Sequence, residues 1–326
     1  MGPGTPGRAA RQKFRIASKL ADDSTRAGVL RCKLMVIESQ PSGTSSAPKE
    51  SDALLVVPTY NERANLQDLV TRFFAAVPRC HLLIVDDESP DGTADLCSEL
   101  QRDHPGLHLL RRSGVRGLGR AYTAGLRYGL ERQYEVIGTM DADLSHNPEH
   151  LKAMLPLTLT SDVVVGSRYI RDGGTINWRI RRIVLSWLAN RFAAWLLRIP
   201  AHDMTSGYRL YRREALEQIP LEEITSNGYS FLVELLYRLH RQGSTVAESP
   251  IIFYDRTLGE SKLAPREIYV GAFRLIRLRL SRGVRKPQRT AVAGRSTGLA
   301  GDQGELGAQE RQETPLPAEH EVGQRS

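Results

Sequence analysis

The sequence predicts an α/β protein built on a doubly wound, mostly parallel sheet, and three observations lead to this prediction. Short apolar runs alternate with segments of helical spacing, which is the arrangement of consecutive βαβ units. Three of the first four predicted strands end in loops that are acidic or rich in Pro and Asn, so these loops should gather at one edge of the sheet. The chain has 326 residues, of which 40% are apolar, enough to form a substantial core.

The alternation begins with an apolar run at 53–57 and a helix over 62–76 whose apolar residues repeat at helical spacing. Pro58 is expected to end the strand because it has no N–H donor, and Asn61 is expected to cap the helix. The remaining strands are predicted at 82–85, 107–110, 136–139, 162–165 and 246–254. The remaining helices are predicted at 93–103, 119–132, 148–155, 176–197, 213–218, 229–242 and 265–282.

Two aspartates end the strand that begins at Val136, with Ala142 between them. Residues two apart in an extended chain point to the same side, so Asp141 and Asp143 can face one spot at the carboxyl end of this strand. In an open α/β sheet that end opens onto the ligand crevice. Two carboxylates there repel each other unless a cation lies between them, and Mg²⁺ is usually held by one or two carboxylates together with phosphate oxygens. Because Asp-x-Asp is also common in turns and helix caps, the pattern alone leaves both interpretations open.

Two further features of the chain favour phosphate ligands. Arg168 follows directly on a predicted strand, where an arginine beside a nucleotide crevice is a candidate phosphate clamp. The glycine-rich segment 114–122 lacks the Gly-Lys-Ser/Thr ending of a P-loop, so we interpret it as a tight turn that opens a helix.

The segment near 176–199 contains all three tryptophans of the chain among several arginines. It suits a helix that lies in a membrane interface, and a core helix with an exposed basic face is the competing interpretation. Arg182 and Ser186 are four residues apart, so they share one helix face and together could hold a phosphate. The helix near 265–282 is basic and amphipathic as well. No stretch contains the roughly 18 uninterrupted apolar residues that span a bilayer.

Composition narrows the partners and the compartment. A net charge of +8 and a pI of about 9.5 favour anionic partners. Only 6% of residues are aromatic, and neither zinc-ligand spacing nor a recognition-helix motif is present, which argues against nucleic acid. Three cysteines without metal spacing suit a reducing compartment, and no signal peptide is visible. The expected organisation is a disordered tail at 1–50, one catalytic domain at 51–283 that includes both basic helices, and a disordered tail at 284–326.

Six motifs in order resemble those of the dolichol-phosphate (polyprenol-phosphate) mannosyltransferases, which are family-2 glycosyltransferases of the GT-A fold. The likeness covers roughly residues 52 to 280 and is specific as an ordered set. The motifs are Pro58-Thr59-Tyr60-Asn61-Glu62, Asp86-Asp87-x-Ser89-Pro90-Asp91-Gly92-Thr93, Gly117-Leu118-Gly119-x-Ala121-Tyr122, Met140-Asp141-Ala142-Asp143-Leu144-Ser145-His146, Gly166-Ser167-Arg168-Tyr169 and Gly259-Glu260-Ser261-Lys262.

The resemblance implies transfer of mannose from GDP-mannose to a polyprenyl (dolichyl-type) phosphate, with inversion and with Mg²⁺ or Mn²⁺ as cofactor. It also implies peripheral binding at the cytoplasmic face of a membrane or a membrane-embedded partner protein. By position in the motifs, the catalytic residues would be Asp141, Asp143 and Arg168, and the metal ligands Asp143 and Ser145. The acceptor phosphate would meet Arg182 and Ser186. The donor would contact Pro58, Tyr60, Glu62, Val85, Asp87, Asp141, Ala142, Asp143, Arg168, Arg256 and Lys262.

Other functions compete with this one. A polyprenyl-phosphate glycosyltransferase that uses UDP-glucose or UDP-GlcNAc keeps the same fold, since Val85 and Asp87 do not distinguish guanine from uracil. A nucleotidyltransferase is disfavoured because the glycine-rich activation loop near the chain start is absent. A non-catalytic nucleotide-binding scaffold is the remaining alternative, and it predicts no metal-dependent nucleotide binding.

Overall fold

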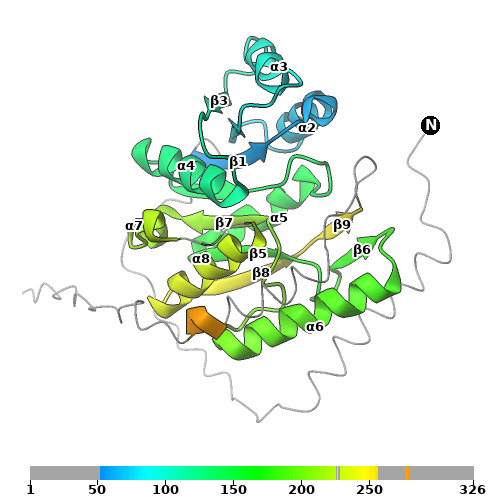
Figure 1. Ribbon diagram of the computed structural model, residues 1–326, viewed down its shortest axis with the longest axis vertical. Helices are drawn as coiled ribbons and strands as arrows, with labels where there is room; N and C mark the ends of the chain where they lie inside the picture. Colours follow the sequence, from blue (N-terminus) through cyan, green and yellow to red (C-terminus); the bar gives the residue numbers. More distant parts are fainter. Residues whose placement is uncertain (1–51, 225, 227, 256–275, 280–326) are drawn as a thin grey trace, which may run out of the picture. The chain divides into compact units, whose positions relative to one another are not determined.

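A seven-stranded sheet forms the centre of the chain in the computed structural model (Figure 1), which describes residues 52–224, 226, 228–255 and 276–279. These residues all belong to the unit Met1–Pro287. The predictions for both tails, for most of the helix at 265–282 and for Arg256 and Lys262 lie outside the described residues. The strands of the large sheet are β1 (Ala53–Thr59), β2 (His81–Asp86), β3 (Leu107–Arg111), β4 (Val136–Thr139), β5 (Val163–Ser167), β7 (Arg209–Arg212) and β8 (Val246–Pro250).

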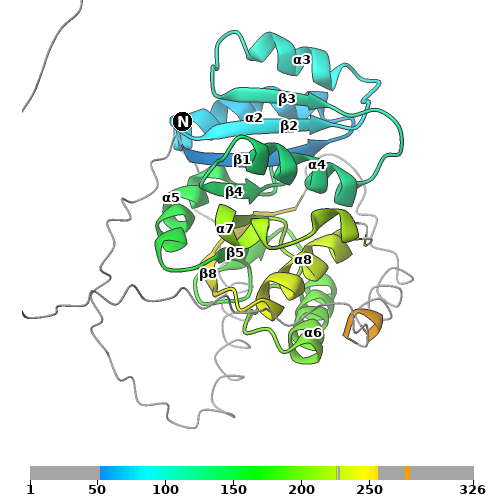
Figure 2. The same ribbon diagram turned by 90° about the vertical axis from the view of Figure 1, so that its left-hand side faces the viewer.

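The strand order β3-β2-β1-β4-β7-β5-β8 confirms the predicted mostly parallel, doubly wound sheet. Within this sheet β7 alone runs antiparallel to its neighbours β4 and β5. The chain moves outward from β1 to β3 and then returns to place β4 on the other side of β1 (Figure 2). This reversal between β1 and β4 is a topological switch point, where open α/β sheets bind their ligands at the carboxyl ends of the strands.

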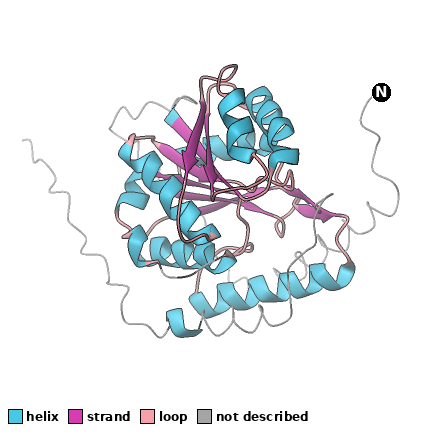
Figure 3. Ribbon diagram, turned by 45° about the horizontal axis from the view of Figure 1, so that its top comes forward, coloured by secondary structure: helices cyan, strands magenta, loops and turns pink. Residues whose placement is uncertain are grey.

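Helices cover both faces of the sheet (Figure 3) because successive strand residues point to opposite sides. Residues such as Leu54 and Val56 face a core formed with α4, α6, α7 and α8, whereas Leu55 and Val57 face a second core with α2, α3 and α5. The helices are α2 (Arg63–Ala76), α3 (Thr93–Leu100), α4 (Leu118–Glu131), α5 (Leu151–Met154), α6 (Ile180–Leu197), α7 (Arg213–Glu217) and α8 (Tyr229–Arg241), with 3₁₀ turns η2 (Pro148–His150), η3 (Leu155–Leu159) and η4 (Leu221–Glu223).

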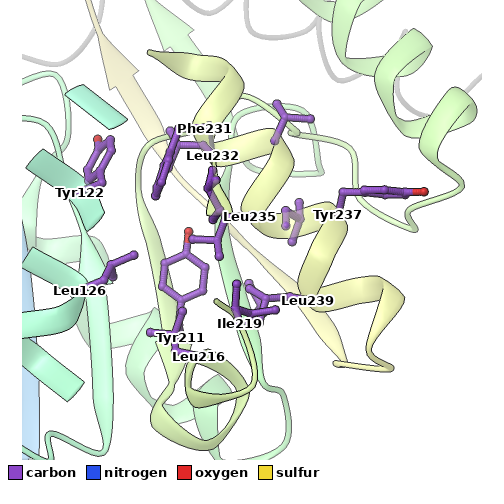
Figure 4. Close-up of a cluster of buried hydrophobic side chains, with 14 of the residues drawn as sticks. Tyr122, Leu126, Tyr211, Leu216, Ile219, Phe231, Leu232, Leu235, Tyr237 and Leu239 are labelled. Carbon is purple, nitrogen blue, oxygen red and sulfur yellow. The ribbon is translucent and has the colours of Figure 1, made fainter. Parts of the chain in front are cut away.

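The first of these cores joins the two halves of the sheet. Figure 4 shows side chains of α4, β7, α7 and α8 meeting there. Tyr122 of α4 stacks on Phe231 of α8 with ring centroids 5.8 Å apart, and both rings are fully buried. This packing fixes α4 against the half of the sheet that contains β7, and the hydroxyl of Tyr122 projects toward the switch point, where it meets Asp141.

The end of β1 differs from the prediction. Pro58 does not end the strand, which continues to Thr59 with Pro58 opposite Val85. The N–H of Met140 donates to the carbonyl of Val56, so the backbone of Val56 faces β4. Pro58, two residues later, faces the same side, but β4 ends at Thr139 and no longer lies opposite it. The missing N–H of Pro58 therefore leaves no ladder bond unmade there.

Two other element boundaries also differ. Asn61 does not cap α2, because the helix begins at Arg63 and the N–H groups of residues 61–63 are accepted by the side chains of Ser89, Asp91 and Thr93, between the end of β2 and the start of α3. The predicted strand at 246–254 is two strands, since the N–H of Ile251 bonds to Ser167 in the large sheet while its carbonyl accepts Gly174 of a small sheet. That small sheet consists of β6 (Gly174–Ile176) and β9 (Ile252–Tyr254), and α6 consequently begins at Ile180 rather than Ile176.

A histidine pair joins β2 and β3 near their amino ends, away from the switch point. The Nδ1 atom of His81 lies 2.9 Å from Nε2 of His108 and 2.6 Å from the hydroxyl oxygen of Tyr134. Burial lowers the pKa of His81. Burial also lowers the pKa of His108, and the nearby positive charges of His81 and Arg132 lower it further. The folded protein therefore favours the neutral imidazoles.

This pair predicts a loss of stability in mild acid. Because both pKa values are lower in the folded state, the unfolded chain binds more protons at and below about pH 6.5, and the unfolding free energy falls as the pH decreases through that value. Replacing both residues (His81→Gln, His108→Gln) should reduce the slope of unfolding free energy against pH between about pH 5 and 6.5. Urea unfolding at several pH values measures this slope. The difference in unfolding free energy between the two proteins at pH 8 is the baseline. Equal slopes in the two proteins would contradict the prediction.

Candidate active site

The site lies at the carboxyl ends of β1, β2, β4 and β5, where loops from distant parts of the sequence meet. Because β7 is antiparallel, its amino end and the loop 203–207 that precedes it reach the same edge. The hydroxyl of Thr139 at the end of β4 donates to the carbonyl of Gly207 at 2.7 Å, which joins this loop to the switch point. The β1, β2 and β4 loops thus lie on one side of this edge and the β5 loop and residues 203–207 on the other, and the space between them is where an α/β sheet of this order has its ligand crevice.

The β1 and β2 loops are bonded to each other through side chains. Asp86 is buried, and it accepts hydrogen bonds from the hydroxyls of Thr59 and Ser89. Ser89 and Asp91 in turn accept the N–H groups of Asn61 and Arg63. This network explains why the loop needs Asp, Ser and Thr side chains, since they satisfy the amino end of α2 that otherwise has unpaired N–H groups. It holds the predicted donor-binding segment 58–62 in place.

Asp87 connects the end of β2 to the turn before α4. One carboxylate oxygen accepts Arg112, and the other accepts the N–H of Gly117 at 3.0 Å. Tyr60 is 45% exposed at the crevice edge, and its hydroxyl accepts Arg116, whose guanidinium carbon lies 4.6 Å from the ring centre. Arg112 and Arg116 are not among the predicted site residues, because the residues that they meet are distant in sequence.

Asp141 is held from three directions. The hydroxyl of Tyr122 donates to Oδ1 of Asp141 at 3.2 Å, and the backbone N–H of Asp141 donates to Nδ1 of His146 at 3.2 Å. A methyl group at Gly207 would come within 2.9 Å of Oδ1, so only glycine lets the loop approach this carboxylate so closely. The carboxylate is 19% exposed, which leaves it partly open to the crevice.

Asp143 and Ser145 have the chemistry of a hard-cation site. The Asp143 carboxylate accepts the N–H of Ser145 at 3.1 Å, and Leu144 between them has a φ of 61°, a left-handed conformation that is unusual for leucine. The hydroxyl of Ser145 is buried and has no hydrogen-bond partner within the described part of the chain. A carboxylate and a buried hydroxyl oxygen without a partner fit Mg²⁺ or Mn²⁺, which prefer oxygen ligands.

The same region does not form a complete metal cage. Among residues 52–224, 226, 228–255 and 276–279, no group of three or more His, Cys, Asp or Glu side chains could hold a metal ion. A cation bound at Asp143 and Ser145 would therefore complete its shell with water and substrate phosphate, as magnesium usually does.

His146 is fully buried beside Asp141, between the rings of Tyr208 and Phe253. Burial lowers its pKa, although Asp141 and Asp143 act in the opposite direction. A neutral imidazole agrees with the hydrogen bond that its Nδ1 accepts. His146 therefore positions the backbone at Asp141.

Arg168, the predicted phosphate clamp, lies at the end of β5 but is held by the protein itself. Its guanidinium donates to both carboxylate oxygens of Asp203, at 2.7 and 2.8 Å, and to the hydroxyl of Thr205 at 2.9 Å. Both side chains of the ion pair are almost wholly buried. Burial alone would raise the pKa of Asp203, but the charge and hydrogen bonds of Arg168 hold it below its usual range. This arrangement supports a positioning role for Arg168, and direct contact with donor phosphate stays a prediction.

The loop 203–207 contributes to the site although none of its residues is among the predicted site residues. Asn190 of α6 accepts the N–H groups of Met204 and Thr205, and the buried guanidinium of Arg209 donates to three carbonyls, two of them in this loop. Its signal in the sequence is a run of polar residues directly before a strand, but its partners lie on other elements. The loop therefore acts as a rigid wall of the crevice.

Arg182 and Ser186, the predicted acceptor-phosphate pair, lie on the first turns of α6 as expected. Arg182 forms an ion pair with Asp255 at 2.8 Å and packs over the ring of Trp178 at 3.9 Å. The guanidinium of Arg168 lies 5.4 Å from the same tryptophan ring. Trp178 thus contacts both Arg182 of the predicted acceptor pair and Arg168 of the crevice wall.

The remaining residues predicted to contact the nucleotide-sugar donor differ in how much of their surface is exposed. Pro58 and Glu62 are half-buried at the crevice edge, and Ala142 is almost buried between the two aspartates. Val85 has no exposed surface, because its side chain lies in the core beside α4, and a contact of its main chain with the nucleotide stays a prediction. Arg256 and Lys262 fall outside the described residues.

Comparisons with known proteins agree with the residue pattern of the site. The model of the family Glycosyl transferase family 2 matches residues 54–220. The chain is 45% identical over 235 residues to polyprenol monophosphomannose synthase of Mycolicibacterium smegmatis, a match that covers 70% of this chain and 89% of the relative. It is 43% identical over 211 residues to undecaprenyl-phosphate mannosyltransferase of Micrococcus luteus, covering 65% of this chain and 87% of that relative.

A solved structure shares the fold. The crystal structure of glucosyl-3-phosphoglycerate synthase from Mycobacterium tuberculosis, in complex with Mn²⁺, UDP and glucosyl-3-phosphoglycerate, superposes with a TM-score of 0.50. The match covers 73% of this chain and 84% of that chain, with 18% sequence identity. At this identity the likeness concerns the fold alone.

The buried ion pair of the crevice wall predicts a large effect on stability. Asp203→Ala leaves the guanidinium of Arg168 buried without its counter-ion, and removing one partner of a buried pair costs about 3–5 kcal/mol of unfolding free energy. Urea unfolding measures the loss. Asp68→Ala breaks an exposed pair with Arg72 and should cost at most about 1 kcal/mol. A loss at Asp203 as small as that at Asp68 would contradict the prediction.

Proposed function

The chain belongs to glycosyl transferase family 2, and from this premise we propose that it transfers mannose from GDP-mannose to a polyprenyl phosphate with inversion at the sugar carbon. The predicted GT-A fold is confirmed by the mostly parallel sheet and by its structural likeness. The observation that carries the proposal is the carboxylate pair Asp141 and Asp143 at the switch point, in a chain 45% identical to a polyprenol monophosphomannose synthase.

The donor is assigned to the β1, β2 and β4 side of the crevice. Tyr60 and Asp87 lie at its outer edge, where the base and ribose would bind, with Pro58 and Glu62 on the same loop edge. The diphosphate would extend toward Asp141 and Asp143. Asp143 and Ser145 would hold Mg²⁺ or Mn²⁺, which when bound would neutralise the charge that develops on the departing diphosphate.

The acceptor side needs no strong general base. A phosphate monoester has a second pKa of about 6, so at neutral pH the nucleophilic oxygen is already ionised. That oxygen forms a bond to the anomeric carbon of mannose as the bond from this carbon to the diphosphate breaks, and GDP leaves with the electron pair. Displacement from the opposite side inverts the configuration. His146 accepts the backbone N–H of Asp141 at Nδ1, so this nitrogen is already occupied, which agrees with a site in which no proton is abstracted.

The acceptor carries a long lipid chain, so we assign a membrane contact to the exposed side of α6. No helix in the described ranges is long and apolar enough to span a bilayer. The competing interpretation, a core helix with an exposed basic face, does not describe α6, because its outward side is largely apolar with Arg181 and Arg191 among the apolar residues. The exposed apolar side chains are Ile180, Val184, Leu185, Leu188, Phe192 and Trp195.

Such a surface suits the interface of an anionic membrane, in which apolar side chains and a tryptophan enter and arginines meet the headgroups. The proposed location is the cytoplasmic face of the membrane. Binding through a membrane-embedded partner protein is the alternative, and it predicts no affinity of the purified chain for lipid alone.

Mannose transfer tests the proposed role of the Asp143 carboxylate. Asp143→Asn keeps the size of the side chain and removes the charge that would hold the cation, so transfer of labelled mannose from GDP-mannose to polyprenyl phosphate should fall by a factor of about 10² or more. Asp95→Asn, at an exposed ion pair with Arg111, is the matched control and should retain activity. Near-normal transfer by the Asp143 variant would overturn the assignment, and preferential transfer from UDP-glucose would change the donor.

The membrane surface predicts a selective effect on vesicle binding. Leu188→Asp places a charge on the apolar side of α6 and should weaken co-sedimentation with vesicles of anionic phospholipid by about tenfold or more, from the lost burial of one leucine. Leu159→Asp is the control, since Leu159 is similarly exposed, at 46% against 52%, but lies in η3. Equal losses in the two variants, or no binding by the unsubstituted protein, would contradict direct docking through α6.

A further inference from the structure

Arg182 is held in a defined place although its side chain is 27% exposed. Its guanidinium carbon lies 3.9 Å from the centre of the Trp178 ring, and its Nη1 atom donates to a carboxylate oxygen of Asp255 at 2.8 Å. Cation–π packing on one side and an ion pair on another leave the long side chain little freedom. The cation assigned to the acceptor phosphate therefore already carries a carboxylate.

Two N–H donors at this ion pair, one on Trp178 and one on Arg182 itself, have no acceptor among the residues that the structure describes. Trp178 is 3% exposed, and its indole N–H has no hydrogen-bond partner within the described residues. The Nε–H of Arg182 is likewise buried without a partner there. A buried donor left unpaired is unfavourable, and in native proteins it calls for an explanation such as a ligand. An indole N–H and a guanidinium N–H that both lack an acceptor suit an anion with several acceptor oxygens.

The main chain at Asp255 is held independently of the ion pair with Arg182. Asp255 follows β9, and its backbone N–H donates to the carbonyl of Ile176 at 3.1 Å, which fixes the main chain. Its side chain is 32% exposed, so rotation about the side-chain bonds can move the carboxylate from Arg182 into water. Arg182 itself stays on Trp178.

We propose that Asp255 is an internal substitute for the acceptor phosphate, which occupies Arg182 in the free enzyme and is displaced when the lipid phosphate binds. This inference rests on the proposed function. A phosphate monoester carries a charge of about −1.5 to −2 and offers three acceptor oxygens, whereas the carboxylate carries a single charge and two oxygens. A phosphate therefore has enough oxygens to accept from Arg182, its Nε–H included, and from the indole N–H of Trp178, the two donors without a partner among the described residues. An unphosphorylated prenol has no charge with which to displace Asp255, so Asp255 contributes to specificity for the phosphate.

The direct test is Asp255→Asn, which keeps the shape of the side chain and removes the competing charge. The KM for polyprenyl phosphate should fall about two- to fivefold, the range that breaking a partly exposed ion pair gives, while the KM for GDP-mannose stays unchanged. In an Arg182→Ala background the same substitution should have no further effect on the acceptor KM, because Asp255 acts through Arg182. If Asp255 instead positions Arg182 for the phosphate, Asp255→Asn raises the acceptor KM, and the proposal is overturned.

The matched control is Glu135→Gln. Glu135 pairs with Arg213 at 2.8 Å, with side chains 40% and 23% exposed, against 32% and 27% for the pair of Asp255 and Arg182. It lies before β4 at the opposite end of the strand from the crevice, and its substitution should leave both KM values unchanged. A fall in the acceptor KM of the same size in this control would show that loss of any such ion pair suffices, and it would overturn the proposal.

A binding measurement separates this inference from the proposed function. Calorimetric titration with farnesyl phosphate, a short soluble prenyl phosphate, should give a two- to fivefold lower Kd for the Asp255→Asn variant than for the unsubstituted protein. Farnesol should bind the two proteins equally. Tighter farnesyl phosphate binding in a protein that transfers no mannose would overturn the function and support the inference. Mannose transfer with an unchanged or higher Kd in the variant would support the function and overturn the inference.

Discussion

The mutual repulsion of carboxylates at one sheet edge is the constraint on which the rest of the site depends. Asp86, Asp87, Asp141 and Asp143 all lie at the carboxyl ends of β2 and β4, on the two sides of β1. Asp86 is surrounded by hydroxyl and N–H donors, and Asp87 is paired with Arg112, so these two carboxylates serve to fasten the loops. Asp141 and Asp143 remain the pair for which a bound cation and a phosphate-bearing substrate provide the natural balance.

The opposite wall of the crevice contains buried positive charges, which also need partners. Arg168 is neutralised by Asp203, and Arg209 is surrounded by backbone carbonyls, so both guanidiniums are satisfied without water. Because Arg168 follows β5, Arg209 begins β7 and most of their partners lie in the loop 203–207, the two arginines fasten these three parts to one another. Arg168 also lies beside Trp178, the ring on which Arg182 packs. A continuous set of contacts thus leads from the crevice wall to the residues assigned to the acceptor.

The sequence predicts the fold and the edge of the sheet well because both depend on local patterns. Apolar runs that end on Pro58, Asp86 or Asp141 define the parallel strands and their loops, and the ordered motifs identify the family. The antiparallel placement of β7 and the contact of Gly207 with Asp141 depend on pairings about seventy residues apart in sequence, which no local pattern contains. Val85 was assigned from its place in the motif, but strand alternation turns its side chain into the core.

The most direct measurement of the central claim is a crystal structure of the protein with GDP-mannose and Mn²⁺, in which anomalous scattering locates the metal. The account predicts a manganese peak within bonding distance of a carboxylate oxygen of Asp143 and of the donor diphosphate, at the carboxyl end of β4. A nucleotide bound in the crevice with no manganese beside Asp143, or a manganese peak elsewhere on the protein, would contradict it.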